Sequence, residues 1–541
     1  MVHEAHSPDT ASLQPDNPSS LTNYQMLMWL GQEQAPQIPL YKMTKTFTFD
    51  GDIDITRFQH AFAQLVQQTD SLRTIITRDA DDTPQQVVLA DIDYQLDILH
   101  LDADEYQQWL QVRRQQPFDM SVRLFDSALI RLSDTRVIWY LSQHHIVSDA
   151  MSFNVMYRRL LQFYQAIPET PAQAFPTFRD YRDQERANRA TDTFQDALAH
   201  WDRALPEAPE KLDFYGQTAV HTANDMRRWR YDLTPEQQQQ LDQLASQKGI
   251  RSISRDLTYY GIFLALYSAF IARLTQARPF VIGTPFGNRN TRQQQAIAGL
   301  LIEMGITQIS LDDTITFREL IQQIARDNRH NLLHAQPGIT QSRYVRAVDV
   351  IMNFNTLDYP SFGDVPVTVE RIHSGYGDRD VAMRMHAYDW NGGGSWEIAF
   401  DLNDSVFDDE TRRLALELFA TVVDAVLAAP DTPIHALDIL APHERQTFIT
   451  DFNQTTADFP TDQTVIQAIA AQAQRTPDAV ALSFADVDWT YQQLMQAVET
   501  VAGRLAEQGI GRGACVAIYL EHSPEMVIGL LATLHCGATY V

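Results

Sequence analysis

LSQHHIVSDAMS, residues 141–152, joins a strand pattern to a helix pattern and carries two adjacent histidines followed by Asp149. The preceding run, RVIWYLSQ, is apolar almost throughout, which is typical of a central strand covered on both faces. The following run, AMSFNVMYRRLLQFYQAI, has apolar residues at helical spacing, and Ser148 or Asp149 suits its N-cap. The polar residues therefore lie where a buried strand gives way to a helix, a frequent position for active sites in α/β proteins.

The two histidines cannot act as a pair on one ligand. Neighbouring strand residues point to opposite faces, so His144 and His145 diverge. We expect His144 to be a core residue satisfied by the backbone, and we keep a core role and a chemical role open for His145. We expect Asp149 to fix the loop by pairing with an arginine, and no third ligand at metal-site spacing lies nearby, so no metal site is predicted.

The composition limits the classes of protein that the chain can represent. At 541 residues it is too long for one hydrophobic core, so at least two packed units are expected. The formal net charge of −27 disfavours a nucleic-acid partner, because phosphate binding depends on Lys and Arg. A neutral or locally shielded ligand fits this charge better.

The sequence predicts a cytoplasmic protein with no membrane partner. Its two cysteines, Cys515 and Cys536, both lie near the C-terminus, and the first twenty residues lack the features of a signal peptide. The longest apolar stretch, Tyr259–Ala272, is shorter than the ~20 residues that span a bilayer. We interpret it as a buried core helix.

Composition and periodicity divide the chain into five parts. We expect a disordered leader over residues 1–20, an α/β lobe over 21–180 and a second α/β lobe over 181–430. A Pro, Asp and Thr-rich linker is predicted over 431–463. Alternating helix and strand patterns over 464–541 indicate part of a further α/β domain.

Several segments, taken in order, resemble the condensation domains of nonribosomal peptide synthetases. HHIVSDA resembles their H-H-x-x-x-D-G signature, LTNYQMLMWL their opening motif, DSLRTII a block ending in L-R-T, and FVIGTPFGNRN their I-G-T-P strand and loop. WTYQQL and LHCGATYV are similar to the first core motifs of an adenylation domain. The resemblance implies an α/β fold of two chloramphenicol-acetyltransferase-like lobes in a V-shaped pseudo-dimer, followed by a truncated α/β adenylation-domain fragment.

The resemblance also implies an activity and its partners. The chain is expected to form an amide bond between a carrier-bound acyl or peptidyl thioester and a carrier-bound aminoacyl acceptor, with starter N-acylation as a variant. No cofactor is expected to bind directly, because the substrates arrive on the phosphopantetheine arms of donor and acceptor carrier proteins. The downstream adenylation domain of the same module is the other expected partner.

The resemblance assigns a role to each motif residue. His145 is implied at the reaction centre, as a base or as a group that orients the amine. The residues implied to be structural are His144, Asp149, Arg289 and Arg73, with Arg289 predicted to pair with Asp149 across the lobes. The residues expected beside the pantetheine tunnel are Ala150, Met151 and Ser152.

Two other functions stay open on the sequence alone. A coenzyme-A-dependent acyltransferase shares the fold and the histidine motif. A noncatalytic docking platform is also possible, because Ala150 stands where the family has glycine and its methyl group could obstruct the thioester or a left-handed backbone.

Overall fold

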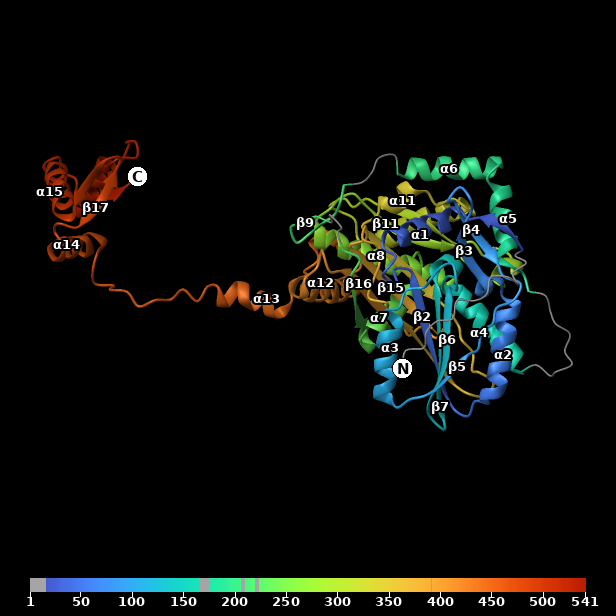
Figure 1. The fold of residues 1–541 in the computed structure, drawn as a ribbon. Coiled ribbons are helices and arrows are strands. Elements are labelled where there is room, and N and C mark those ends of the chain that lie inside the picture. Colours follow the sequence, from blue (N-terminus) through green and yellow to red (C-terminus); the bar gives the residue numbers. More distant parts are fainter. Residues whose placement is uncertain (1–15, 166–174, 206–209, 219–222, 391) are drawn as a thin grey trace. The chain divides into compact units, whose positions relative to one another are not determined.

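The computed structural model describes residues 16–165, 175–205, 210–218, 223–390 and 392–541 (Figure 1). The chain forms two compact units, Met1–Pro442 and His443–Val541. The first unit contains both predicted lobes, which confirms the expectation of two α/β lobes built around separate sheets.

The N-terminal lobe is built on a five-stranded sheet with the order β14-β2-β7-β6-β5. Its strands are β2 (Lys42–Asp50), β5 (Asp97–His100), β6 (Phe125–Ser133), β7 (Arg136–His144) and β14 (Val367–Ile372). The helices α2 (Ile55–Gln68) and α4 (Ala150–Gln165) pack on one face, and α3 (Ala103–Arg114) packs on the other.

Strand β7 is apolar from Val137 to Leu141 because both of its faces are covered, as predicted. Val137, Trp139 and Leu141 pack in the core under α2 and α4. Ile138 and Tyr140 face α3. This central strand ends at His144, so the histidine pair lies at its C-terminal end.

Strand β14 comes from the second half of the sequence yet completes the sheet of the first lobe. It pairs antiparallel with β2, from Val367 opposite Phe49 to Ile372 opposite Thr44. The predicted lobe boundary at residue 180 is therefore too simple, since it also cuts α5 (Phe178–Asn188). The crossing strand joins the two lobes through backbone hydrogen bonds.

The predicted disordered leader is wrong at its end. Residues 16–20 form β1 (Asp16–Ser20), which pairs antiparallel with β4 (Pro84–Val88) beside β3 (Thr74–Arg78). Pairing with β4 satisfies backbone groups that a disordered segment leaves to water. Residues 1–15 of the predicted leader lie outside the described residues.

The C-terminal lobe is built on a six-stranded sheet with the order β10-β16-β15-β13-β11-β12. Its strands are β10 (Met226–Asp232), β11 (Phe280–Gly287), β12 (Ile302–Ile309), β13 (Val350–Thr356), β15 (Met383–Asp389) and β16 (Glu397–Asn403). The helices on one face are α7 (Pro235–Ser246), α8 (Arg255–Thr275), α10 (Phe317–Leu333) and α12 (Asp409–Ala428). The helices α6 (Asp192–Ala204) and α11 (Ser342–Arg346) pack on the other face.

Helix α8 is longer than its sequence pattern predicted. Its 21 residues are sufficient in length and apolarity to cross a membrane, with a mean hydropathy of 1.4. However, 78% of this apolar stretch is buried inside the protein, against the sheet and the neighbouring helices. The interpretation as a buried core helix is therefore confirmed.

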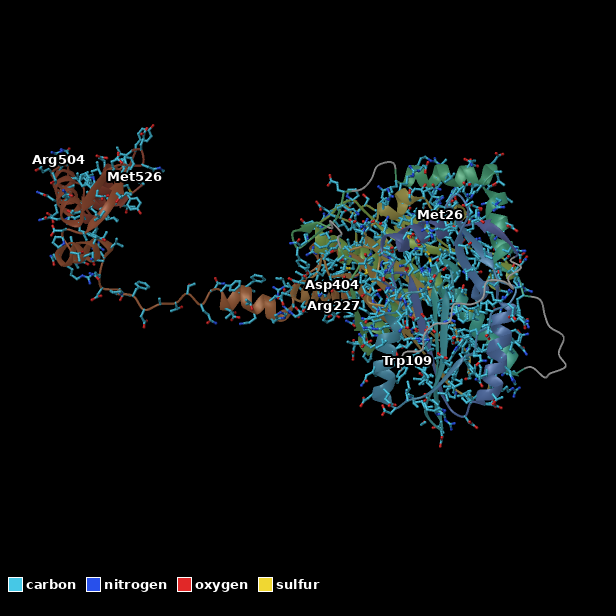
Figure 2. All side chains as sticks on the ribbon, viewed as in Figure 1. Met26, Trp109, Arg227, Asp404, Arg504 and Met526 are labelled. Carbon is cyan, nitrogen blue, oxygen red and sulfur yellow. The ribbon has the colours of Figure 1, made fainter. Side chains whose placement is uncertain are left out.

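The linker begins later than predicted. Residues 431–441 still belong to the first unit, where Ile434 and Leu437 are buried in the C-terminal core. In the same lobe, a salt bridge between Arg227 and Asp404 ties β10 to the loop before α12 (Figure 2). Local composition alone cannot reveal such packing.

The second unit alternates helices and strands as predicted. It contains α14 (Val465–Arg475), the hairpin β17 (Val480–Phe484) and β18 (Val487–Thr490), α15 (Tyr491–Glu507) and α16 (Pro524–His535). The short strands β19 (Cys515–Val516) and β20 (Thr539–Tyr540) pair in parallel. Leu494, Val498 and Ala532 form its small core.

Candidate active site

The predicted active-site loop follows β7 directly. His144 is the last residue of the strand, and a short 3-10 turn, η3 (His145–Val147), leads to α4. The N–H of His145 donates to the carbonyl oxygen of Tyr41 at 2.8 Å, which anchors the turn to the segment before β2. The loop is thus held by main-chain bonds on both sides.

His144 is a structural residue, as its position in the strand predicted. Its side chain is buried, its Nδ1 accepts the N–H of Ile146 at 3.1 Å, and its Nε2 lies 3.3 Å from Oε1 of Gln32. Burial, with a smaller contribution from His145, lowers the pKa of His144 to about 3. A neutral imidazole with Nε2 protonated satisfies both contacts.

His145 points away from His144 and reaches the interior cavities of the first unit. Its Nδ1 lies 2.7 Å from the carbonyl oxygen of Ser148, so Nδ1 carries the proton. Burial lowers the pKa of His145 despite the opposing effect of Asp149, so the ring is neutral at neutral pH. Its Nε2 therefore presents a lone pair that can accept a hydrogen bond.

Asp149 is fully buried and forms the predicted ion pair with Arg289. The guanidinium Nη1 and Nη2 lie 2.7 Å and 2.9 Å from the two carboxylate oxygens. The N–H groups of Ser152 and Leu301 donate to the same oxygens at 2.9 Å and 3.0 Å. Burial acts to raise the pKa of Asp149, but Arg289 and these donors hold it below its usual value. These contacts fix the loop. They also keep the Asp149 carboxylate ionised, so it has no proton to donate.

Ser152 does not lie beside a tunnel, contrary to the prediction. Its side chain is fully buried, donates to the carbonyl oxygen of Gly299 at 2.7 Å and accepts the N–H of Gly299 at 2.9 Å. The reason is helical spacing: three residues beyond Asp149, Ser152 faces the same side of the helix start. It ties α4 to the loop before β12.

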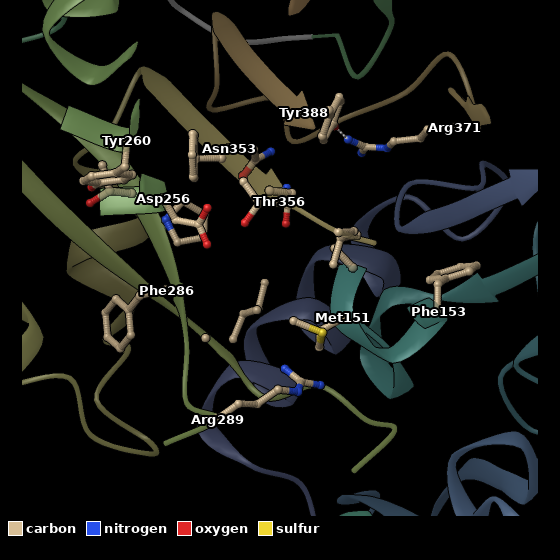
Figure 3. A pocket seen from close by; sticks show the side chains of 18 of the residues that line it. Met151, Phe153, Asp256, Tyr260, Phe286, Arg289, Asn353, Thr356, Arg371 and Tyr388 are labelled. Atoms are coloured by element: carbon tan, nitrogen blue, oxygen red, sulfur yellow. Dashed lines mark hydrogen bonds between the residues drawn. The ribbon is translucent and has the colours of Figure 1, made fainter. Parts of the chain in front are cut away.

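Ala150 and Met151 line a cavity, and Figure 3 shows Met151 in it; their place beside a pantetheine tunnel stays a prediction. Ala150 is the first residue of α4 and has a right-handed helical backbone, so the glycine of the family motif is not needed here for a left-handed conformation. Within the described part of the chain, no backbone acceptor contacts the N–H of Ala150 or Met151. These are the donors that a helix N-terminus leaves free.

Arg73 is a structural residue remote from the cavities. Its guanidinium donates to the carbonyl oxygens of Leu89 and Ala90, the latter at 3.3 Å. These bonds hold the end of η2 (Asp70–Arg73) against the segment that follows β4.

Two cavities meet at His145. The larger, of about 410 Å³, is also lined by residues of β2, α4, α8, β11 and β13. The smaller, of about 140 Å³, extends toward α1 (Asn23–Gln34) and β15. The residues that line both are Met43, His145, Pro285, Ile302, Asn353 and Arg371. A ligand can therefore approach His145 from either cavity.

Sequence reasoning missed two cations at this site, Lys45 and Arg371. Lys45 follows Met43 on the face of β2 that continues with Phe47 and Phe49, so a lysine interrupting an apolar stripe was the available signal. Arg371 lies on β14, and nothing local in the sequence places that strand beside β2. Arg371 donates to Tyr388 and, at 3.1 Å, to Nδ1 of His386 (Figure 3).

The fold and this site define a two-lobed α/β class of protein, in which a loop histidine meets two internal cavities. Comparison with known proteins specifies the family. The model for the condensation domain matches residues 17–449, and that for the AMP-binding enzyme matches residues 469–541. The chain belongs to the condensation-domain family and continues into an AMP-binding segment.

Relatives of known sequence are multidomain synthetases. A dimodular nonribosomal peptide synthase of Bacillus subtilis (strain 168) is 24% identical over 99% of this chain and 22% of its own length. Tyrocidine synthase 3 of Brevibacillus parabrevis is 25% identical over 93% of this chain and 8% of its own length. The chain thus spans less than a quarter of the length of these two relatives.

Solved structures share the fold of the first unit. A variant of the starter condensation domain of rhizomide synthetase in complex with C8-CoA has a TM-score of 0.69 and 20% identity, over 78% of this chain and 98% of that one. The first condensation domain of the CDA synthetase also has a TM-score of 0.69 and 20% identity. The likeness covers 79% of this chain and 100% of that one. The predicted chloramphenicol-acetyltransferase-like fold is confirmed by this likeness.

Proposed function

We propose that this chain catalyses attack of a carrier-bound aminoacyl amine on a carrier-bound acyl or peptidyl thioester. The observation that carries the proposal is that the neutral ring of His145 lines both cavities. Two tethered substrates that enter separately need one common meeting point, and His145 supplies it. The family membership of residues 17–449 supports the same reaction class.

The reaction needs little acid–base chemistry from the protein. The amine nitrogen bonds to the thioester carbon, the C–S bond breaks, and the proton lost by nitrogen balances the thiolate that leaves. An α-amine has a pKa of about 7.7 to 8.0, so part of it is neutral at neutral pH. Nε2 of His145 accepts an N–H of the attacking amine, either to orient it or to take its proton.

Positioning supplies most of the expected acceleration. Holding both thioesters beside His145 converts a bimolecular step into an effectively intramolecular one, worth up to about 7 to 11 kcal/mol. The N–H groups of Ala150 and Met151 are suited to stabilise the developing oxyanion, since they begin α4 and lie at the larger cavity. The Asp149–Arg289 pair holds this helix start in place.

The partners follow from this reaction. The proposed substrates are thioesters on the phosphopantetheine arms of donor and acceptor carrier proteins, and the AMP-binding segment is proposed to belong to the adenylation domain that loads the acceptor. A cytoplasmic location agrees with this chemistry and stays a prediction.

Starter N-acylation from coenzyme A is the second candidate. The solved relative from rhizomide synthetase is a starter domain in complex with C8-CoA, which makes an acyl-coenzyme-A donor worth testing on this chain. The acceptor chemistry at His145 is the same in both cases.

The test is a transfer assay with the purified chain, an acceptor carrier loaded with an amino acid, and a donor offered either on a carrier or on coenzyme A. Mass spectrometry of the acceptor arm identifies the amide. We expect the carrier-bound donor to give product; product from the coenzyme A donor alone assigns the starter variant. No amide from either donor, with both carriers shown to be loaded, would instead favour a docking platform.

A further inference from the structure

Lys45 is a buried lysine on an apolar strand face. Its Nζ donates to the hydroxyl oxygen of Tyr359 at 2.6 Å and lies 5.2 Å and 4.9 Å from the ring centres of Phe153 and Trp390. Only 4% of the residue is exposed, and Lys45 lines the larger cavity together with His145. Aromatic faces favour a cation at this point, but burial and then Arg371 hold the pKa of Lys45 well below its ordinary value.

A second cation faces Lys45 directly. Arg371 on β14 is the antiparallel cross-strand partner of Lys45 on β2, so both side chains project to the same face of the sheet. Arg371 also lines the larger cavity (Figure 3). Two cations directly opposite each other destabilise a sheet, so an anion bound between these side chains would favour the charged form of Lys45.

In the described part of the chain, Asp149 and Asp401 act on this pair only from a distance, and neither forms an ion pair with Lys45 or Arg371. Among the residues that the structure describes, no carboxylate oxygen lies within 4.0 Å of Lys45 or Arg371. The third cation of the cavity, Arg289, is already paired with Asp149. Asp256, a carboxylate that lines the same cavity, lies at the start of α8, 4.0 Å from Arg255 and away from Arg371 (Figure 3).

The polar residues behind Arg371 do not neutralise it either. Asp401 forms a salt bridge with Arg228 at 2.7 Å. It also accepts a hydrogen bond from the Nε2–H of His386 at 2.7 Å. His386 then offers only its Nδ1, which accepts from Tyr388 at 2.6 Å and from Arg371. The hydrogen bonds of Arg371 to Tyr388 and His386 both use Nη1, and no described residue accepts a hydrogen bond from its Nη2 or Nε.

We propose that the substrate held in the larger cavity carries a carboxylate, which Lys45 and Arg371 bind together. This inference rests on the proposed function and deepens it by naming the substrate class. The carboxylate belongs either to the acyl donor, as in a dicarboxylic half-thioester, or to the side chain of an acidic acceptor. Either substrate places its thioester at His145 and its anion at the Lys45–Arg371 pair.

The phosphate of a pantetheine arm does not fit this position. In a loaded arm the phosphate lies at the end remote from the thioester. Arg371 and His145 line both cavities, and Lys45 lines the larger one with them. The cation pair therefore lies near the reacting end, among the buried aromatic rings.

The test compares ligands that differ only by a carboxylate and its primary amide. Nonreactive donor analogues are pantetheine thioethers ending in a carboxylate or an amide, and nonreactive acceptor analogues are aspartyl or asparaginyl amides of a pantetheine amine. Calorimetric titration gives the affinity of the wild type, Lys45→Met and Lys42→Met for each. Lys42 is a buried lysine on the same strand that lines the smaller cavity but not the larger, and its Nζ donates to the carbonyl oxygens of Arg113 and Gln116 at 2.7 Å and 2.9 Å.

We expect the wild type to bind the carboxylate member of one pair at least about tenfold more tightly than its amide. Lys45→Met should reduce this ratio to near unity, and Lys42→Met should keep it. Equal affinities within both pairs for the wild type would overturn the inference, even if Lys45→Met failed to fold. Because binding is measured without turnover, a failed transfer assay leaves this result readable, and the donor and acceptor pairs identify which substrate carries the anion.

Discussion

Asp149 and Arg289 form a two-pronged ion pair across the two lobes, with N–O distances of 2.7 Å and 2.9 Å and almost no exposure to solvent. Asp149 lies at the start of α4 in one lobe, and Arg289 follows β11 of the other. The pair therefore locks the loop that carries His145 to the sheet of the second lobe.

Replacing Asp149 by Asn should destabilise the first unit. The amide keeps an acceptor but turns N–H donors toward Arg289, which stays buried without its counter-ion. Breaking a buried pair in this way costs about 3 to 5 kcal/mol. We expect a clear drop in the thermal unfolding midpoint, measured by calorimetry.

Asp134→Asn is the control for that experiment. Asp134 pairs with Arg131 at 2.7 Å, but its side chain is 96% exposed, so its loss should leave the midpoint nearly unchanged. An Asp149→Asn protein that is fully stable yet inactive would show that the carboxylate acts in the chemistry rather than in the architecture.

Ser152→Ala should lower stability rather than alter substrate binding. The change leaves the buried N–H and carbonyl of Gly299 without their partner, at a cost of about 1 to 3 kcal/mol. Ser121→Ala removes an exposed hydroxyl that donates to Asp119 and serves as the control. A Ser152→Ala variant with native stability and a changed Michaelis constant would contradict this structural role and support the predicted position of Ser152 beside the tunnel.

His144 should make the protein less stable in acid. Its pKa is about 3 in the folded protein and about 6.5 in the unfolded chain, so below pH 6.5 the unfolded chain binds a proton that the folded one does not. The free energy of unfolding then falls as the pH drops, by about 2 kcal/mol from pH 7 to pH 5 for this residue alone.

The measurement is the pH dependence of unfolding for the wild type and His144→Asn. The variant keeps an acceptor for the N–H of Ile146 but cannot titrate, so its unfolding midpoint should change less between pH 7 and pH 5. Parallel pH profiles for the two proteins would contradict the assignment of His144 as a neutral core residue.

Lys45→Met should raise the unfolding midpoint of the free protein. Methionine fits among the surrounding aromatic rings and removes a buried amine whose charged form burial and the opposite Arg371 disfavour, a gain of about 0.2 to 1 kcal/mol. Lys42→Met should have the opposite sign, because it deprives two carbonyl oxygens of the ammonium that binds them. If Lys45→Met lowered the midpoint as much as Lys42→Met, the cation pair would be a stabilising feature without need of a ligand.

Local patterns predicted those elements whose burial is visible in sequence. The runs that form β7, β11 and β13 are rich in apolar residues because the sheets are covered on both faces. The crossing of β14 into the first sheet was not predictable, because it depends on pairing between segments more than 300 residues apart. The same crossing brings Arg371 to Lys45, which is why that part of the site was missed.

The site was predicted where motif and spacing act together. His145, Asp149 and Arg289 were expected from the resemblance. In the structure Asp149 and Arg289 form an ion pair, and Asp149 lies close enough to His145 to affect its pKa. Ser152 was assigned to the wrong side because the turn of the helix, rather than closeness in sequence, decides which side chain faces the cavity.

Single-turnover amide formation by variants of His145 tests the central claim most directly. In His145→Asn the side-chain amide can replace Nδ1 toward the carbonyl oxygen of Ser148 but leaves nothing at Nε2, whereas Gln can offer an oxygen near Nε2. With loaded donor and acceptor carriers, we predict that His145→Asn slows product formation by about 10²- to 10⁴-fold while the unfolding midpoint stays near that of the wild type. Partial recovery of the rate in His145→Gln would indicate that His145 orients the amine through a hydrogen bond. No recovery in His145→Gln would indicate that His145 acts as a base. Product formation at the wild-type rate by a folded His145→Asn protein would contradict the account.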